Sequence, residues 1–384
     1  MKKLFYSGLA GLAVFEILKV YFIMPMPGSQ RMNSLEVAYF LHGYRWVFRI
    51  ACAGAILAGA KAAFQVRHKW LPVIPVLLAG VVTWLFNFVA TADHIFEQPH
   101  HLVLKPRLEN KLPLSSVVVA VEHNGEAKAY PIRYLIYHHQ VQDTVGGKPF
   151  IITYCSVCRT GRVFEPIVNG RTEKFRLVGM DHFNAMFEDA TTGSWWRQAT
   201  GEAVAGPLKG TNLPDAAYSQ VTLRQWFALH PAALVMQPDQ TALDEENYDI
   251  FGRYERGKSR GDLTRTDRFS WQEKSWVVGV QVGAVSKAYD WNRLKKMRVI
   301  NDTVGATPIV LALAGDGQGY VAFERPVGAG DFALKDNILS AGGKSYDFSG
   351  RDLAGAAGRL KQVNAHQEFW HSWRTFHPGT LQFK

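Results

Sequence analysis

One pair of cysteines in this chain has a spacing suited to chemistry at sulfur. Cys155 and Cys158 form a C-x2-C motif, whereas Cys52 lies apart from them in an apolar stretch. A thiolate is a nucleophile and also a ligand for soft metal ions. A C-x2-C pair can therefore hold one metal ion, close a disulfide or exchange electrons as a dithiol. Covalent haem attachment is excluded, because Arg159 stands where a CxxCH motif needs histidine.

Histidine and methionine side chains could complete a metal site with these thiols. His138 and His139 precede the predicted strand that ends at the CxxC. If the segment that follows is a strand, Met180, His182 and Met186 share one of its faces. Cysteine, histidine and methionine together suit copper, above all Cu(I), and suit zinc less well because no second CxxC is present. The predicted metal ligands are Cys155, Cys158, His138, His139, His182 and Met180.

Three interpretations of the CxxC stay open. The first is a soft-metal site, which would deliver copper or pass electrons to a membrane or periplasmic partner. The second is a thiol–disulfide oxidoreductase in which Cys155 and Cys158 are the catalytic residues. The third is a non-catalytic binding module whose CxxC is a structural disulfide. The sequence does not decide whether the protein is an enzyme.

Four further side chains are predicted to wall this site. Arg159 adjoins the thiols and is expected to lower their pKa. Trp195 and Trp196 belong to the same predicted wall, although burial in a core is the simpler role for a tryptophan pair. Arg197 completes the wall and is placed to pair with Glu202.

An internal repeat restricts the CxxC to one part of the chain. Residues 118–158 align without a gap to residues 277–317, at an offset of 159 positions, and 12 of the 41 aligned pairs are identical. The second copy has Ala314 and Gly317 in place of the two cysteines, and Met297 and Arg298 in place of the two histidines. Because the second copy has the same pattern without cysteines, the fold is not expected to need a disulfide at the CxxC. Function is therefore expected in the first copy.

Composition and charge favour a membrane protein over a nucleic-acid-binding one. The net charge is +10, but the basic residues are scattered and form no long run, which argues against nucleic acid. Apolar stretches cover residues 4–26, 46–64 and 70–92, and the last has no charged residue over 23 positions, enough to span a bilayer. Glu16 and Lys19 interrupt the first stretch and are spaced to pair on a helix. That first stretch could instead be a signal peptide, but it lacks a clear cleavage site.

The basic residues around these stretches predict an orientation. Those on one side of a three-span arrangement are Lys2, Lys3, Lys61, Arg67 and Lys69, and those that argue weakly for the reverse are Arg31, Arg45 and Arg49. The positive-inside rule then places the N-terminus in the cytoplasm and the chain after Asp93 outside. We expect a protein of the inner membrane with its soluble part on the extracytoplasmic side, where disulfides persist.

The soluble part is predicted to be α+β and mainly β, with two pseudo-symmetric repeats packed together. The expected domains are the membrane region 1–95, the first repeat 96–238, and a connection with the cysteine-free second repeat 239–384. Asn-Gly at 124–125 predicts a β-hairpin of type I′. Further expected elements are hairpins around 169–170 and 192–193, a buried strand at 150–154, and helices at 131–138, 223–230 and 367–376.

Several motifs resemble those of the bacterial and archaeal domain-of-unknown-function family 3179. They are the run at 137–164 with its Tyr-Cys-x-x-Cys, the TGSWWRQ segment at 192–198, the GEAVAGP segment at 201–207, and a tryptophan before His230-Pro231. The resemblance covers roughly residues 110–380 and implies the family fold in an extracytoplasmic setting, with no established activity. Two departures stand out: the family's Trp-His-Glu element is Tyr137-His138-His139 here, and Arg159 replaces the glycine after the second cysteine.

Overall fold

The computed structural model describes residues 1–239, 247–250, 266–355 and 358–384, which form two compact units. The first unit consists of Met1–Glu97, Phe175–Arg197 and Glu202–Thr211, and the second of Gln98–Lys174, Gln198–Gly201 and Asn212–Lys384. The predicted α+β class is confirmed. The predicted boundaries near residues 96 and 239 stay predictions, and most of the connection at 239–268 lies outside the described residues.

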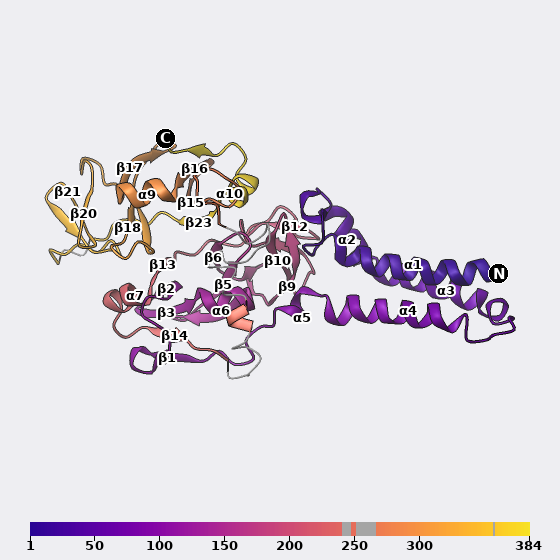
Figure 1. Ribbon diagram of the computed structural model, residues 1–384. Helices are drawn as coiled ribbons and strands as arrows, with labels where there is room; N and C mark the ends of the chain where they lie inside the picture. The colour runs from indigo at the N-terminus through magenta and orange to yellow at the C-terminus, as the bar shows by residue number, and fades with distance from the viewer. Residues whose placement is uncertain (240–246, 251–265, 356–357) are drawn as a thin grey trace. The chain divides into compact units, whose positions relative to one another are not determined.

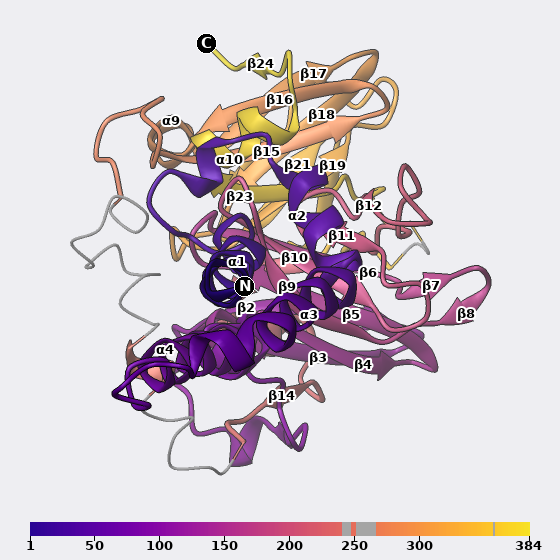
Figure 2. The same cartoon turned by 90° about the vertical axis from the view of Figure 1, so that its right-hand side faces the viewer.

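Apolar helices dominate the N-terminal part of the first unit. Its helical elements are α1 (Lys2–Tyr21), η1 (Ser29–Arg31), α2 (Leu35–Gly43), α3 (Arg45–Ala63), α4 (Val73–Trp84), η2 (Leu85–Val89) and α5 (Ala92–Ile95). By length and composition, α1 and α3 are able to cross a membrane. The helices α1, α3 and α4 lie side by side, and the N-terminus lies near the loop that joins α3 to α4 (Figures 1 and 2).

The stretch at 70–92 is shorter as a helix than the sequence predicted. The helix begins only at Val73, because Pro72 occupies its N-cap, and it changes to a π-helical turn at Leu85. The predicted pairing of Glu16 with Lys19 is confirmed at 3.1 Å. Arg49 and Asn87 also hydrogen-bond to the carboxylate of Glu16, so one polar cluster joins α1, α3 and η2.

A four-stranded antiparallel sheet completes the first unit. Its order is β12 (Ala203–Ala205), β11 (Trp195–Arg197), β10 (Asn184–Asp189) and β9 (Phe175–Asp181). Ala38 of α2 packs in one apolar cluster with Val178 and Met186 of the sheet, and His42 lies 3.2 Å from Glu188. The TGSWWRQ and GEAVAGP segments thus fold largely with the N-terminal helices.

The second unit contains two runs of elements in the same order. The first run is β2 (Val117–His123), β3 (Glu126–Pro131), α6 (Ile132–His138), β4 (Gln140–Val145), β5 (Lys148–Cys155), β6 (Thr160–Phe164), β13 (Ser219–Thr222), α7 (Leu223–Leu229) and β14 (Leu234–Met236). The second run is β15 (Trp276–Val282), β16 (Val285–Asp290), α9 (Trp291–Met297), β17 (Val299–Val304), β18 (Thr307–Leu313), β19 (Tyr320–Glu324), β23 (Ala365–Phe369), α10 (Trp370–Phe376) and β24 (Leu381–Gln382).

Strand register agrees between the two runs. Val118 pairs with Pro131 in the first hairpin, and Val277 pairs with Asp290 in the other, so both partners are 159 positions apart. The same offset relates β4–β5 to β17–β18 and β5–β6 to β18–β19. The Asp-Thr-Val-Gly segments end β4 and β17, and both glycines have positive φ, which a β-carbon disfavours.

One sheet contains strands of both runs. The largest sheet has the order β1-β14-β3-β2-β13-β19-β18-β17, so β13 of the first run pairs with β19 of the second. Strand β23 of the second run also lies beside β6 of the first, although the two belong to different sheets. The remaining small strands are β1 (Leu104–Pro106), β7 (Ile167–Val168), β8 (Arg171–Thr172), β20 (Ala333–Lys335), β21 (Ile338–Ala341) and β22 (Lys344–Tyr346), and η3 (Arg107–Glu109) follows β1.

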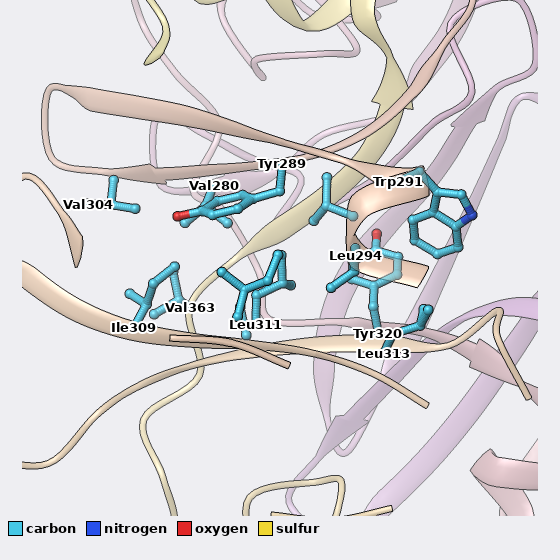
Figure 3. Close-up of a cluster of buried hydrophobic side chains, with 13 residues drawn as sticks. Val280, Tyr289, Trp291, Leu294, Val304, Ile309, Leu311, Leu313, Tyr320 and Val363 are labelled. Carbon is cyan, nitrogen blue, oxygen red and sulfur yellow. The ribbon is translucent and has the colours of Figure 1, made fainter. Parts of the chain in front are cut away.

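The second run packs its own apolar core between sheet and helix (Figure 3). Val280 and Tyr289 of the β15–β16 hairpin face Leu311 of β18, and Leu294 of α9 closes the cluster. All four are buried. The alternation of apolar residues along these strands places one face in this core, as period two requires.

Most of the predicted local elements are confirmed, and two need correction. The hairpin at Asn124-Gly125 has both residues at positive φ, as type I′ requires. The hairpin at 169–170 is confined to β7 and β8, because β6 pairs with β5 and β9 pairs with β10 instead. The last helix begins at Trp370 and not at 367, since residues 365–369 extend β23 along β15.

Candidate functional site

The hairpin of β5 and β6 positions the two thiols. Cys155 ends β5 and pairs with Thr160, the first residue of β6, so Cys158 lies in the tight turn between the strands. Both cysteines are fully buried, and no disulfide joins them. The Cys158 thiol interacts directly with Cys155, which raises the pKa of Cys158, so the two sulfur atoms are close neighbours.

The backbone conformation of Arg159 explains why the family pattern has glycine at this position. Its φ is +58°, in the left-handed region where glycine is favoured. The side chain offsets that strain, because its guanidinium lies 3.5 Å from the ring centroid of Trp276 and its Nε donates to Gln367. The expectation that Arg159 lowers the pKa of the thiols stays a prediction. Burial raises the pKa of Cys158, and Lys274 is a cation that opposes this rise.

Strand β23 and helix α10 of the second run cover the thiol turn. The backbone N–H of Phe369 donates to the carbonyl of Cys158 at 2.9 Å, which fixes the start of α10 against the turn. His371 and Ser372 follow in the first turn of α10, and Ser372 is fully buried. Ser372 lies close to Cys158 and lowers its pKa. The CxxC of one run is thus completed by side chains of the other.

Lys274 is the cation that acts on both thiols. Its Nζ donates to the carbonyl of Val157, between the two cysteines, at 2.9 Å and lies 3.2 Å from Nε2 of His371. It also lies 4.7 Å from the ring centroid of Phe369, and the residue is only 5% exposed. Burial lowers the pKa of Lys274. The negative charges of Cys158 and Cys155 raise this pKa, and they do so more than the nearby carboxylates do.

The two thiols cannot both ionise easily. Burial raises the pKa of Cys158 well above its ordinary value, and the neighbouring Cys155 raises it further. Ser372 and Lys274 act in the opposite direction. Without a bound cation, the arrangement therefore favours one thiolate and one thiol over two thiolates. We call Cys155, Cys158, Lys274, His371 and Ser372 the thiol centre.

His371 is neutral at ordinary pH. Burial lowers its pKa to about 3, and the charge of Lys274 lowers it in addition. A neutral imidazole can accept the hydrogen bond from Lys274 at Nε2. The other ring nitrogen then carries the proton and is able to donate.

His138 and His139 lie in the same unit as the thiols but have other partners. The Nε2 of His138 lies 2.6 Å from the hydroxyl of Tyr248. His139 ends α6 at a φ of +60°, with Nδ1 3.3 Å from the carbonyl of Tyr137. Burial lowers the pKa of His139 to about 4, so its ring is neutral at pH 7 and only one of its nitrogens carries a proton.

Met180 and His182 belong to the first unit, on the β9–β10 hairpin. The prediction that Met180, His182 and Met186 share one strand face is wrong, because His182 and Phe183 form the turn, each at positive φ, and Met186 lies on the next strand opposite Gly179. His182 contacts Asp181 through Nδ1 at 2.6 Å and Asn33 through Nε2 at 3.1 Å.

The predicted wall residues of TGSWWRQ lie in the first unit as well. Trp195 and Trp196 are buried, as expected of core residues, and their indole nitrogens donate to Glu188 and Asp189 at 2.8 and 2.9 Å. The predicted pair of Arg197 with Glu202 is confirmed at 3.3 Å. A shorter contact of 2.6 Å joins Arg197 to Asp181, which lowers the pKa of that carboxyl against the effect of burial.

The predicted six-residue ligand set does not form one cluster in the part of the chain that the structure describes. Across those residues, no three cysteine, histidine or acidic side chains are grouped to hold a metal ion. Sequence reasoning missed Lys274, His371 and Ser372. One sequence pattern relates to these residues: a tryptophan precedes His-Pro at both 230–231 and 377–378. The pattern identifies α10 as the counterpart of α7, but it does not place α10 at the thiols.

The comparisons with known proteins agree with the resemblance. A model for proteins of unknown function, DUF3179, matches residues 103–380. The chain therefore belongs to the DUF3179 family. Curated proteins and solved structures give no match. The matched region contains the whole thiol centre, whereas α1 to α5 precede it.

Proposed function

We propose that the thiol centre binds one Cu(I) ion between Cys155 and Cys158. Soft thiolates select Cu(I), and two thiolates with one Cu(I) carry a net charge of −1. Lys274, which acts on both sulfur atoms from a buried position, supplies the matching +1. The position of this ammonium is the observation that carries the proposal, because burial of an unbalanced charge is costly.

Zinc suits the same centre less well. Two thiolates with one Zn²⁺ are neutral, so Lys274 would add an unbalanced charge, and a structural zinc site needs four ligands. Cys155 and Cys158 supply only two. His371 is a neutral imidazole near the thiols, but its Nε2 is engaged with Lys274.

A second candidate function is thiol–disulfide exchange. A single thiolate beside Lys274 gives a neutral centre too. Because the pKa of Cys158 is raised, we assign this thiolate to Cys155. The Cys155 thiolate would attack a disulfide of a protein substrate and release one substrate thiolate. Cys158 would then lose its proton and attack Cys155, releasing the second thiolate and leaving a Cys155–Cys158 disulfide. The substrate gains two electrons, and a dithiol reductant restores the centre.

The third interpretation, a structural disulfide, has less support. The scaffold forms the same hairpins in the second run, where Ala314 and Gly317 replace the cysteines. This likeness supports the proposal that the second unit consists of two pseudo-symmetric repeats, which arose by duplication of one segment. The first repeat would have kept or gained the thiols, and the second would supply Lys274 and α10.

We further propose three membrane spans, α1, α3 and α4 with η2, in the inner membrane. The basic residues at the N-terminus and in the α3–α4 loop gather at one end of this helical region, which supports a cytoplasmic location for that end (Figure 1). The thiol centre would then be extracytoplasmic, with a membrane or periplasmic donor or acceptor as partner. A reporter fused after Leu104 tests the orientation, and a cytoplasmic signal would overturn it.

Copper loading of the full chain tests the main proposal. The protein in lipid nanodiscs is reduced, exposed anaerobically to Cu(I) and washed with a weak chelator, and its copper is measured. We expect one copper per chain, lost in Cys155→Ser and in Cys158→Ser but kept in Cys52→Ser, the matched control. Metal-free protein whose disulfide has a potential near −200 mV, as in exchange catalysts, would support the second candidate. A disulfide that resists reduction would support the third.

A further inference from the structure

A large cavity in the second unit lies apart from the thiol centre. Its volume is about 750 Å³, within the range of small-molecule sites. Both runs of elements contribute to its lining. Arg162 of β6 and Asp215 come from the first, whereas His366 of β23 and His377 after α10 come from the second. None of these residues belongs to the thiol centre.

Two neutral histidines give this cavity hydrogen-bond acceptors. The hydroxyl of Tyr218 donates to the carbonyl of Gly161 at 2.6 Å and lies 2.8 Å from Nδ1 of His366. Since that hydroxyl has one proton, Nδ1 of His366 carries its own proton and donates it to Tyr218. Nε2 of His366 is then an acceptor. His377 has the same tautomer, because its Nδ1 lies 3.1 Å from the carbonyl of Trp373.

Burial keeps both imidazoles uncharged. It lowers the pKa of His366 well below its ordinary value, and the charge of Arg162 lowers it further. Burial also lowers the pKa of His377, although Glu368 opposes that effect. At neutral pH both rings therefore present a lone pair and not a positive charge.

The charges around the cavity are balanced within the protein. Arg162 forms a buried ion pair with Glu368, and its Nε donates to the carbonyl of Ala199 at 2.9 Å. Glu324, at the cavity, lies 2.6 Å from Nζ of Lys361. Burial raises the pKa of Asp215, which reduces its tendency to ionise, although Arg162 opposes this. An ionic ligand would lose hydration here without gaining an unmatched opposite charge.

We infer that this cavity binds an uncharged, polyhydroxylated ligand of mono- to disaccharide size. Hydroxyl groups can donate to Nε2 of His366 and His377 and accept from the amides of Gln362 and Asn364, which also line the cavity. Phe376 supplies an apolar surface for the carbon-bound hydrogens of a sugar ring. Polar groups fix the orientation of such a ligand, and the apolar face adds affinity. This inference does not depend on what the thiols do.

Binding of trehalose and maltose to the full chain tests the inference. Nanodiscs are used, because detergents with maltoside headgroups would compete. Isothermal titration calorimetry should show saturable binding of at least one of the two sugars. His377→Leu should weaken that binding at least tenfold. His230→Leu, the corresponding His-Pro histidine after α7 and outside this cavity, should change it less than twofold.

A second variant keeps the test valid if His377→Leu does not fold. Ala284 lies at the cavity in an exposed position of the β15–β16 turn, so Ala284→Trp fills the cavity without disturbing a core. This variant should abolish sugar binding while its thermal unfolding stays unchanged. Binding of citrate or spermidine in place of sugars would overturn the inference. Absence of binding by every probe, or sugar binding that survives Ala284→Trp, would overturn it as well.

Discussion

Substitution of Lys274 by glutamine is the sharpest test of the charge balance at the thiols. In the wild type, Nζ of Lys274 donates to the carbonyl of Val157 at 2.9 Å. The change removes the ammonium but keeps a side chain that is able to donate to this carbonyl. Lys274 is 5% exposed, so solvent cannot readily replace the lost charge. The thiol that ionises first should therefore become harder to ionise, and the centre should hold Cu(I) less tightly.

The expected size of the effect follows from the burial of the charge. Two unit charges about 4 Å apart interact by about 4 kcal/mol at the effective dielectric constant of about 20 that reproduces protein data. Glutamine recovers part of the hydrogen bonding, so we expect a net loss of about 3 kcal/mol. That loss corresponds to a rise of about 2 in the pKa of the first thiol and to about a 100-fold weaker Cu(I) complex.

Two measurements check this expectation. The pH dependence of thiolate absorbance reports the pKa, and competition with a chromophoric Cu(I) chelator reports the affinity. Lys274→Arg keeps the charge, so its Cu(I) affinity should lie within tenfold of that of the wild type. Lys287→Gln, which removes a lysine paired with Asp302 at 2.6 Å, is the matched control for loss of a charge elsewhere. A folded Lys274→Gln protein with unchanged thiol pKa and unchanged Cu(I) affinity would refute the reasoning.

Three further outcomes concern stability. Arg159→Gly relieves the left-handed backbone by about 1–2 kcal/mol but loses a stack on Trp276 of about 2 kcal/mol, so chemical denaturation should show a change within about 1 kcal/mol. His139 has a folded-state pKa of about 4 against 6.5 when unfolded, so the unfolded chain binds the proton first. The free energy of unfolding should hence fall by about 3 kcal/mol as pH drops from 6.5 to 4, and His139→Asn, which tolerates the φ of +60°, should reduce this slope; an equal slope in both proteins would contradict it. Arg162→Met strands the buried carboxylate of Glu368 and should cost about 3–5 kcal/mol in denaturant unfolding, most of it recovered when Glu368→Leu is added; a double variant no more stable than the single one would count against the ion-pair argument.

Local chemistry made much of the fold predictable. Asn124-Gly125 specifies a type I′ turn by its own backbone preference, and the structure has that turn. The repeat at 118–158 and 277–317 predicted matching hairpins, and their registers agree at the same offset. These features depend on residues within a few positions of each other, or on one comparison of the chain with itself.

The features that sequence reasoning missed depend on distant contacts or on unusual backbone. His182 and Phe183 form a turn with positive φ but without glycine or asparagine, so the segment read as a continuous strand. Lys274 and His371 reach the thiols through contacts between distant parts of the chain, such as that of β23 with β6, which no local pattern records. Arg159 was taken for the relevant cation, because it is adjacent in sequence; the structure shows that its charge lies against Trp276.

The separation of the thiols from their cover has a consequence for biosynthesis. Cys155 and Cys158 are made before α10, which begins only at Trp370. At about 5–20 residues per second, the roughly 210 residues between them take on the order of 10–40 s. During that interval the nascent thiols are open to oxidants, metals and wrong partners. The two sulfur atoms are therefore buried only after α10 has been made.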